Sequence, residues 1–319
     1  MEKTGKILRI EKISLNDGQG MRTVIFFKGC PLRCAWCSTP ESQCMNEEVC
    51  YQSQRCTGCG RCITACPQNA LSVDEETGRI VRNRVLCTNC AACVKVCPAK
   101  AQGVYGKQMT LAQVMKQIYR DEVFYFHSGG GVTLSGGDVL LQAEFARKIL
   151  QACKESGIHT AAELDLFGPY EKIQMLLPFL DVLYVDVKMM DPESHKKWTG
   201  QDNKGILENL RRVSEVCGKD ALHIRVPLVP GVNDSPGNLL ATAEFCKSLS
   251  HCAELEFLPY HRLGQAAYTY LDRESLFRHM PSMTPEEAAE KIACLETCVL
   301  PFPVRVAGRQ VFPTAEVRR

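Results

Sequence analysis

Cysteine is the residue type in this sequence that points most directly to chemistry. The 319-residue chain contains 19 cysteines, and thirteen of them fall between Cys30 and Cys97. Because the sequence starts without an apolar leader, we expect thiolates for metal or redox chemistry rather than an oxidised disulfide framework. The remaining six are expected to be ordinary buried thiols, since free cysteine is among the most buried residue types. They are Cys153, Cys217, Cys246, Cys252, Cys294 and Cys298.

The cysteines from residue 56 to residue 97 form two copies of one pattern. Each copy reads Cys-x2-Cys-x2-Cys-x3-Cys-Pro, and the copies lie 31 residues apart. This is the bacterial ferredoxin run for [4Fe-4S] clusters, in which the fourth cysteine of each copy binds the other cluster. A pair of zinc ribbons is the alternative, but zinc sites prefer two separated Cys-x2-Cys pairs. The pattern predicts one cluster on Cys56, Cys59, Cys62 and Cys97, and another on Cys66, Cys87, Cys90 and Cys93.

A third motif, Cys30-x3-Cys34-x2-Cys37, offers only three ligands. A [4Fe-4S] cluster held by three thiolates leaves one iron free for an outside ligand, as open coordination positions do in catalytic metal sites. A zinc site or an incidental group of thiols is the alternative. The spacing therefore favours a catalytic cluster here, beside two clusters with complete ligand sets.

The elements that position these motifs alternate between helical and strand-like patterns. Residues 22–28 form an apolar, buried first strand that runs directly into Gly29 and Cys30. From residue 110 onward, short β-branched strands follow helices, which predicts a parallel sheet with helices outside it, either a barrel or a doubly wound sheet. Helices are predicted over 110–122, 142–156, 170–177, 204–217, 235–248 and 285–298, and strands over 132–135, 159–163, 182–187, 222–228, 254–258 and 304–306.

The segment 50–105 has little periodicity and carries the internal repeat, so it is interpreted as an insertion. Two domains are predicted: residues 1–49 with 106–319, and the insert 50–105. Lys and Arg total 38 against 36 Asp and Glu, so there is no basic field for nucleic acid or a membrane surface. No stretch has the roughly 18 apolar residues of a membrane span. We expect a soluble, cytoplasmic monomer.

The three-cysteine motif at the end of a first strand, with Trp36 before the last cysteine, resembles the radical S-adenosylmethionine (SAM) enzymes. Within them the chain resembles the glycyl radical enzyme activating enzymes over nearly its whole length. The similar segments, in the same order, are 15–24, 27–34, 128–138, 157–160, 185–188, 225–234 and 258–264. The resemblance implies an α/β fold: a partial (βα)6-type parallel barrel with an inserted ferredoxin-like domain that carries two [4Fe-4S] clusters.

The resemblance also implies a set of site residues. Cys30, Cys34 and Cys37 would hold the catalytic cluster, and Asp17 would face the partner enzyme. Glu163 and Asp186 would reach the SAM carboxylate through a monovalent cation, and Lys188 would lie near that carboxylate. The residues implied to bind SAM are Trp36, Cys37, Ser38, Gly136, Gly137, Asp138, Glu163, Asp186, Val187, Lys188 and His261.

Four positions depart from the family pattern. The family usually has Asp-Gly-Pro-Gly, and here Gln19 takes the place of the proline. After the paired glycines, Asp138-Val139 replaces the usual Glu-Pro. Asp138 keeps the carboxylate, one methylene shorter. Some members have a hydroxyl residue at the position of Leu164. The missing hydroxyl counts against a cation site more than the two acids count for it.

The activity implied is reductive cleavage of SAM to a 5′-deoxyadenosyl radical that takes a hydrogen atom from the Cα of one partner glycine. Flavodoxin or ferredoxin would donate the electron, and the insert clusters would relay it or dock the partner. The leading partner is isethionate sulfite-lyase, followed by choline trimethylamine-lyase. Two alternatives are a radical SAM enzyme that modifies a peptide or small molecule directly, which predicts auxiliary cysteines after the barrel, and a non-enzymatic Fe-S electron carrier, which leaves the alternating region unexplained.

Overall fold

A computed structural model describes residues 4–312 of the chain. Its main feature is one sheet of ten strands among these residues. In spatial order the strands are β14 (Arg309–Phe312), β13 (Val304–Val306), β12 (Glu254–Pro259), β11 (Leu222–Leu228), β10 (Val182–Asp186), β9 (His159–Leu164), β8 (Gly131–Gly136), β2 (Arg22–Phe27), β1 (Thr4–Ser14) and β7 (Lys107–Thr110).

The centre of the sheet is parallel and its strands follow one another in chain order. β2 pairs with β8, and each strand from β8 to β13 pairs with the next in parallel. The order never reverses, as it would in a doubly wound sheet. Antiparallel strands β1 and β7 extend one edge, and β14 extends the other. The chain therefore has an α/β fold built on a large mixed sheet.

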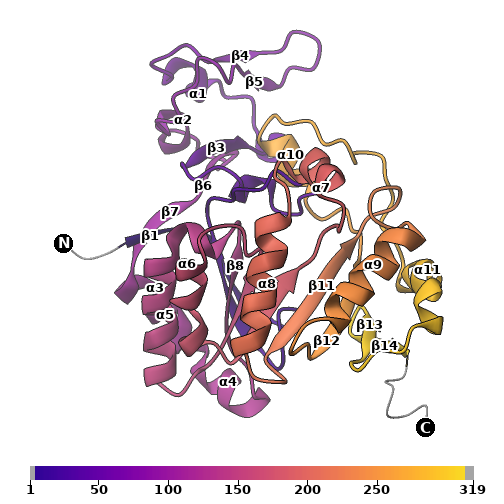
Figure 1. Cartoon of the computed structure of the whole chain (residues 1–319). Coiled ribbons are helices and arrows are strands. Elements are labelled where there is room, and N and C mark those ends of the chain that lie inside the picture. The colour runs from indigo at the N-terminus through magenta and orange to yellow at the C-terminus, as the bar shows by residue number, and fades with distance from the viewer. Residues whose placement is uncertain (1–3, 313–319) are drawn as a thin grey trace.

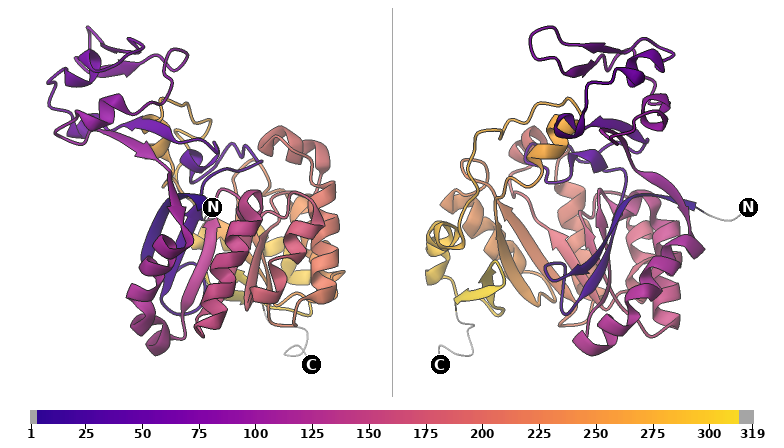
Figure 2. Two further views of the ribbon diagram at one scale, coloured as in Figure 1. Left: turned by 90° about the vertical axis from the view of Figure 1, so that its left-hand side faces the viewer. Right: turned by 180° about the vertical axis from the view of Figure 1, so that it is seen from behind.

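Helices cover one face of this sheet (Figure 1), and the view from behind shows the strands of the other face (Figure 2). No helix of the described part is long and apolar enough to cross a membrane. The helices outside the segment 50–105 are α3 (Leu111–Ile118), α4 (Glu122–Ser128), α5 (Ala143–Glu155), α6 (Tyr170–Gln174), α7 (Pro192–Thr199), α8 (Lys204–Val216), α9 (Pro236–Lys247), α10 (Gln265–Tyr270) and α11 (Pro285–Lys291).

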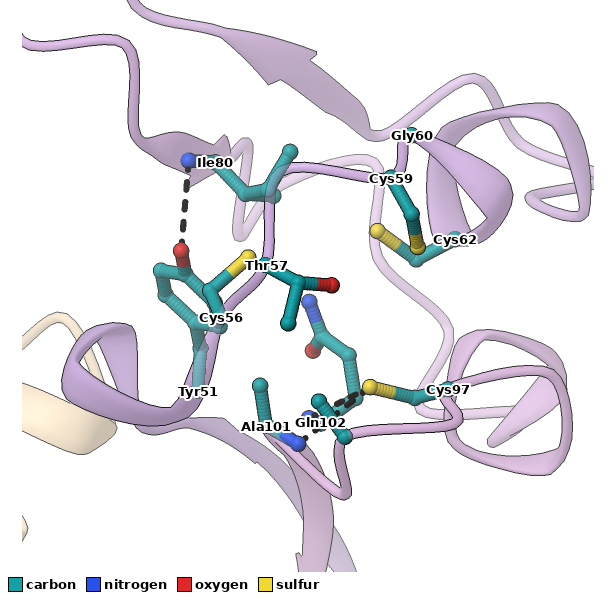
Figure 3. A pocket seen from close by; sticks show the side chains of 11 residues that line it. Tyr51, Cys56, Thr57, Cys59, Gly60, Cys62, Ile80, Cys97, Ala101 and Gln102 are labelled. Carbon is teal, nitrogen blue, oxygen red and sulfur yellow. Dashed lines mark hydrogen bonds between the residues drawn. The ribbon is translucent and has the colours of Figure 1, made fainter.

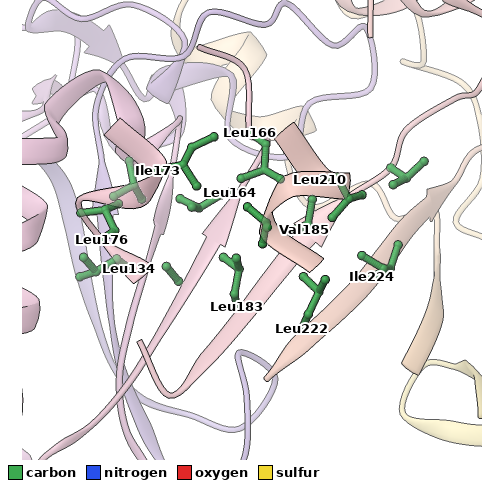
Figure 4. Close-up of a cluster of buried hydrophobic side chains, with 14 of the residues drawn as sticks. Leu134, Leu164, Leu166, Ile173, Leu176, Leu183, Val185, Leu210, Leu222 and Ile224 are labelled. Atoms are coloured by element: carbon green, nitrogen blue, oxygen red, sulfur yellow. The ribbon is translucent and has the colours of Figure 1, made fainter. Parts of the chain in front are cut away.

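The two faces of the sheet differ in polarity. Leu134, Leu183 and Ile224 point toward the helices, where they pack against Ile173 of α6 and Leu210 of α8 (Figure 4). Burying each such side chain stabilises the fold by about 1.5–3 kcal/mol. Because side chains alternate along a strand, the intervening residues face the other side. These are mostly polar: Thr133, Ser135, Glu163, Tyr184, Asp186, His223, Arg225, Glu254 and Glu256. This face, which lies opposite the helices and is called the inner face below, is therefore suited to a polar site.

The segment 48–105, which lies between β2 and β7 in the chain, projects from the rest of the molecule (Figure 1). Strands β3 (Glu48–Tyr51) and β6 (Gln102–Tyr105) pair antiparallel at its base. Between them lie α1 (Arg61–Thr64), β4 (Leu71–Val73), β5 (Ile80–Arg82) and α2 (Ala92–Lys95). A small core of its own, which includes Val49, Tyr51, Leu71 and Ile80, holds it together.

The internal repeat of this segment is visible in the backbone. Three pairs of residues 31 positions apart adopt left-handed φ values: Gly58 (70°) with Asn89 (54°), Gly60 (68°) with Ala91 (58°), and Asn69 (48°) with Lys100 (53°). Four of the six are not glycine, although this conformation is unfavourable for other residues. The two copies therefore share one conformation as well as one sequence pattern.

The predicted parallel strands are all present, but several other elements are not where the pattern placed them. The helix predicted over 110–122 ends at Ile118, and a tighter turn at Tyr119–Asp121 separates it from α4. The helix predicted over 285–298 ends at Lys291. The antiparallel strands β1, β7 and β14, and the helices α7 and α10, were not predicted. Residues 1–3 and 313–319 of the first predicted domain lie outside the described residues.

Candidate active site

The three-cysteine loop (residues 29–38) leaves the carboxyl end of β2 and is anchored by backbone hydrogen bonds. Gly29 N donates to Ser42 O at 2.6 Å, and Ala35 N donates to Trp198 O at 3.0 Å. Burial raises the pKa of each of its three thiols above the usual range, and for Cys30 the nearby carboxylates raise it further. Such thiols lose their protons when they bind a metal, because the thiolate is the ligand.

The cysteine groups do not form a site for a single ion. Within residues 4–312, no three His, Cys, Asp or Glu side chains converge closely enough to hold one metal ion. This observation concerns single ions, because a [4Fe-4S] cubane takes one thiolate at each of several separate iron corners. The donor set of the three-cysteine loop, with thiols at three closely spaced positions, fits a cubane with one open corner.

Lys188 lies in an acidic cluster beside this loop. Its ammonium is 2.6 Å from Asp165 Oδ1 and 2.8 Å from Asp186 Oδ2, and only 8% of its side chain is exposed. Asp165 Oδ2 lies 3.8 Å from Cys30 Sγ. Burial would lower the pKa of Lys188, but the carboxylates of Asp165 and Asp186 outweigh burial and raise it. A fixed positive charge therefore stands between two acids next to the first cysteine.

Asp138 follows the carboxyl end of β8 and carries an unpaired oxygen. Its carboxylate is almost fully buried, at 1% exposure. Oδ1 accepts a hydrogen bond from Leu140 N at 2.9 Å, whereas Oδ2 has no partner in the described residues. Burial, and then the charge of Asp165, raises the pKa of Asp138 to about 7. A buried acceptor without a donor is costly unless a ligand supplies one, so this oxygen fits the ammonium group of an amino acid.

The paired glycines before Asp138 let two backbones approach closely. Gly136 has φ 118°, and a Cβ at Gly137 would lie 2.1 Å from Gly29 O. Asp138 N donates to the same carbonyl at 2.7 Å. The glycines therefore hold the end of β8 against the start of the three-cysteine loop, which places Asp138 beside Cys30.

The eight cysteines of the repeat gather in two groups. One hollow is lined by Cys56, Cys59, Cys62 and Cys97 together with Tyr51 (Figure 3). A second hollow is lined by Cys66, Cys87, Cys90 and Cys93. This is the crossed grouping that the ferredoxin pattern predicts. Backbone N–H groups already point at sulfurs: Ala101 N lies 3.2 Å from Cys97 Sγ, and Ala70 N lies 3.3 Å from Cys66 Sγ. Such bonds are typical around cluster thiolates.

Comparison with known proteins decides the family. A model of the Radical SAM superfamily matches residues 24–243. The isethionate sulfite-lyase activating enzyme of Oleidesulfovibrio alaskensis is 40% identical over 276 residues, which cover 85% of this chain and 88% of that protein. The choline trimethylamine-lyase activating enzyme of the same organism is 38% identical over 310 residues, which cover 96% and 99%. The chain belongs to the glycyl radical enzyme activating enzymes of the radical SAM superfamily.

Activating enzymes of this family cleave SAM and form a glycyl radical on a partner enzyme. The family predicted from the cysteine spacing and the ordered motifs is thus confirmed. A distant solved structure, SuiB of Streptococcus suis bound to its precursor peptide SuiA, has a similar fold, with a TM-score of 0.53 and 11% identity. That match covers 92% of this chain and 50% of SuiB, and it concerns the fold alone.

Glu163 of the activating enzyme does not share a partner with Asp186. Its carboxylate binds Arg225 Nη1 at 2.7 Å and accepts a hydrogen bond from Ser135. Burial raises the pKa of Glu163, and the charge of Arg225 opposes this. Arg225 also binds Glu256 at 3.2 Å and lies 3.8 Å from the centre of the Tyr184 ring. The two acids that the resemblance pairs therefore each bind a cation of the chain itself, and each cation is shared with a second acid, Asp165 or Glu256.

The other predicted SAM contacts lie at different places around the three-cysteine loop. Trp36 packs in an apolar cluster with Val229 and Tyr260. Ser38 is exposed, and a Cβ at Gly264 would lie 2.8 Å from its carbonyl oxygen. His261 is exposed three residues before Gly264. The side chain of Val187 is buried in the hydrophobic core, and its N–H donates to Arg225 O at 2.8 Å, so only its backbone is near the polar face.

Asp17 lies at the opposite end of β2 from Cys30. Ser14 Oγ donates to its carboxylate, and Thr133 Oγ1 donates to its carbonyl at 2.7 Å. The six residues of β2 span about 20 Å at the usual rise per residue. In the activating enzyme the structure therefore does not bring Asp17 to the three cysteines.

Two residues beside the site were missed in the sequence. Asp165 directly follows β9, and Arg225 lies on the inner face of β11. The rule that sites form at the carboxyl ends of parallel strands would have indicated Asp165. Arg225 lies within the similar segment 225–234, but nothing in its spacing predicts the ion pair with Glu163.

Proposed function

We propose that the mouth formed by Cys30, Asp138 and Lys188 binds SAM next to a [4Fe-4S] cluster on the three-cysteine loop. The observation that carries this proposal is the buried, unpaired Asp138 Oδ2, which fits the amino group of the methionine moiety. Lys188 would face the carboxylate of that moiety. When bound, the cluster supplies the electron that cleaves SAM to methionine and a 5′-deoxyadenosyl radical. No general acid or base is required of the chain.

The chain's own residues would position and shield the cosubstrate. Asp138 and Lys188 have opposite charges and would orient the amino and carboxylate groups, which fixes the direction of the sulfonium. The apolar cluster with Trp36, Val229 and Tyr260 would cover the neighbouring side and exclude water. The other predicted contacts, Ser38, Gly136, Gly137, Val187 and His261, would complete the lining. Asp17 would meet the partner at the far end of β2.

A monovalent cation does not fit this site. Glu163 is held by Arg225 and Ser135, and Asp186 is held by Lys188. Leu164 has no hydroxyl, and its side chain is buried in the hydrophobic core on the other face of the sheet. Each of these acids already has a partner in the chain, so we assign no role to a bound cation here.

We infer that residues 50–105 form a ferredoxin-like insert, and that residues 1–49 and 106–319 form a partial (βα)6-type barrel. The insert would hold two [4Fe-4S] clusters, on Cys56, Cys59, Cys62 and Cys97 and on Cys66, Cys87, Cys90 and Cys93. The two hollows and the N–H groups that point at Cys66 and Cys97 support these ligand sets. The electron donor would be a flavodoxin or ferredoxin, and the cytoplasm, where thiols stay reduced, would be the location of a monomeric enzyme.

The partner we propose is isethionate sulfite-lyase, and choline trimethylamine-lyase is the second candidate. The identities of 40% and 38% support this order, while the longer matched length favours the second. The test is anaerobic electron paramagnetic resonance (EPR) of the reconstituted enzyme with SAM, reductant and each candidate partner. A glycyl doublet with one partner only would identify it. Formation of 5′-deoxyadenosine without any doublet would contradict both candidates.

A further inference from the structure

Glu48 is a buried carboxylate at the entrance to the insert, outside the proposed SAM site. It is the first residue of β3 and is only 8% exposed. Lys28 Nζ lies 3.2 Å from Glu48 Oε2, and Arg273 Nη2 binds Glu48 Oε1. A buried carboxylate is tolerated when cations and hydrogen bonds satisfy it. Glu48 therefore depends on two residues that are far from it in the sequence.

Lys28 connects this carboxylate to the three-cysteine loop. It immediately follows β2, precedes Gly29 and is fully buried. Its ammonium also donates to Glu41 O at 2.6 Å, in the turn after Cys37. At the exit of the insert, a Cβ on Gly106 would lie 2.3 Å from Lys28 Cδ. The Lys28 side chain therefore contacts residues at the entrance and at the exit of the insert, and the turn that follows the three-cysteine loop.

Arg273 connects the same carboxylate to the segment that contains α10. Its guanidinium donates to Pro40 O at 2.7 Å, next to the three-cysteine loop. The preceding residue, Asp272, binds Arg84 of the insert at 2.9 Å. At the other end of this segment, a Cβ on Gly264 would lie 2.7 Å from Cys37 O. The segment 264–273 therefore contacts the insert at one end and the three-cysteine loop at the other.

We propose that Lys28, Glu48 and Arg273 form a joint that fixes the position of the insert relative to the three-cysteine loop. These are positioning residues, and the inference rests on the proposed function only in assigning clusters to the insert. The joint is next to one hollow in particular. Val49 follows Glu48 and lines the hollow of Cys66 and Cys87, whereas Tyr51, about 7 Å further along β3, lines the other. The Cys66, Cys87, Cys90 and Cys93 group is thus the one beside the joint.

The test uses Glu48→Gln and Arg273→Ala in the reconstituted full chain, with Arg273→Lys as the conservative rescue. Arg278→Ala is the matched control, because Arg278 lies beyond the segment 264–273, is exposed and is outside the joint. Removing one partner of a buried ion pair should accelerate amide hydrogen exchange in β3 and β6 by about a hundredfold, with exchange in β9 to β11 unchanged. Arg273→Lys should restore part of the slow exchange. Iron content and SAM binding should stay at the level of the control.

The second readout separates positioning from a general loss of stability. In the two joint variants, the EPR relaxation that the insert clusters and the catalytic cluster impose on one another should weaken. Flavodoxin-driven formation of 5′-deoxyadenosine should slow severalfold relative to Arg278→Ala, because the rate of electron transfer falls as the distance between clusters grows. Exchange and relaxation equal to those of Arg278→Ala would overturn the joint. Wild-type enzyme with about four rather than about 12 irons would contradict the cluster assignment, while the exchange measurement would still decide on the joint.

Discussion

Asp138 is the residue on which the proposed SAM site depends most. Its buried Oδ2 has no donor in the described residues, so Asp138→Asn replaces the charged acceptor with a neutral amide at nearly the same volume. Hydrogen bonds to charged groups are worth about 1.5–3 kcal/mol, so the Kd for SAM should rise by about tenfold to a hundredfold. Equilibrium binding to the reconstituted, anaerobic enzyme measures this. Asp220→Asn, at an exposed position, is the control, and equal affinities in the two variants would contradict the assignment.

The pH dependence of SAM binding follows from the same carboxyl group. The pKa of Asp138 is raised to about 7, so this acid takes up a proton as the pH falls through 7 and loses the charge that attracts an ammonium. Affinity should therefore rise with pH up to about 7 and then level off, with a limiting slope of about tenfold per pH unit. Binding titrations from pH 6 to pH 8 should show this dependence in the wild type and lose it in Asp138→Asn. A slope retained in the variant would assign it to another group.

From the ion pairs of Lys188 and Arg225 we expect that this enzyme works without sodium or potassium. Each already forms an ion pair with an acid that the resemblance assigns to a bound cation. The rate of 5′-deoxyadenosine formation should change by less than about twofold when alkali cations are replaced by tetramethylammonium, because screening of a buried pair by salt is weak. Lys188→Met should lose SAM cleavage, and added potassium should not restore it. A requirement for alkali cations in the wild type would show that a cation displaces Lys188.

How far the site could be read from the sequence differs from residue to residue. Cysteine spacing predicts two sets of cluster ligands, because such ligands obey fixed intervals, and each of the two hollows is lined by one of these sets. Asp165 was missed because a single acid after a strand has no such interval. The partners of Glu163 depend on strand order, which no local pattern reports.

At the scale of elements, the parallel strands were predictable and the edges of the sheet were not. Buried strands such as β10 are continuous apolar runs. Strand β1, which lies between β2 and the edge strand β7, is partly exposed and its register with β2 is irregular. Its sequence therefore shows neither a clear alternating pattern nor a continuous apolar run. The short helix α10 has no periodicity to detect, although its segment touches both the insert and the three-cysteine loop.

Gly264 lets this segment pack closely against the three-cysteine loop. A Cβ there would lie 2.7 Å from Cys37 O and 2.8 Å from Ser38 O, and these backbone atoms cannot move aside cheaply. Gly264→Ala should therefore push the segment away from the three-cysteine loop and destabilise the fold by about 1–3 kcal/mol. Thermal unfolding and loss of the cluster absorbance in air would measure the effect. Gly237→Ala, in α9 with open space around it, is the matched control and should be neutral or stabilising by about 1 kcal/mol.

At the scale of the whole molecule, a cysteine-rich segment adjoins a sheet whose inner face is polar. The two cysteine groups of this segment line hollows with different residues of β3. The group of Cys90 shares its hollow with Val49 beside Glu48, whereas the group of Cys59 shares its hollow with Tyr51. Counted along β3 from Glu48, the group of Cys90 is therefore the near group and the group of Cys59 the far one. Which group is near could not be read from the repeat, because its two copies have the same pattern.

This order makes Cys90→Ala and Cys59→Ala distinguishable. Each variant should lose about four irons, because each removes one ligand from one predicted cluster. Cys90→Ala should remove most of the EPR relaxation between the insert and the three-cysteine loop, whereas Cys59→Ala should preserve it and affect mainly the rate of reduction by flavodoxin. Cys217→Ala, which packs against the hydrophobic core, is the control for loss of a thiol. The reverse pattern in the two variants would place the group of Cys59 next to the barrel and contradict the geometry of β3.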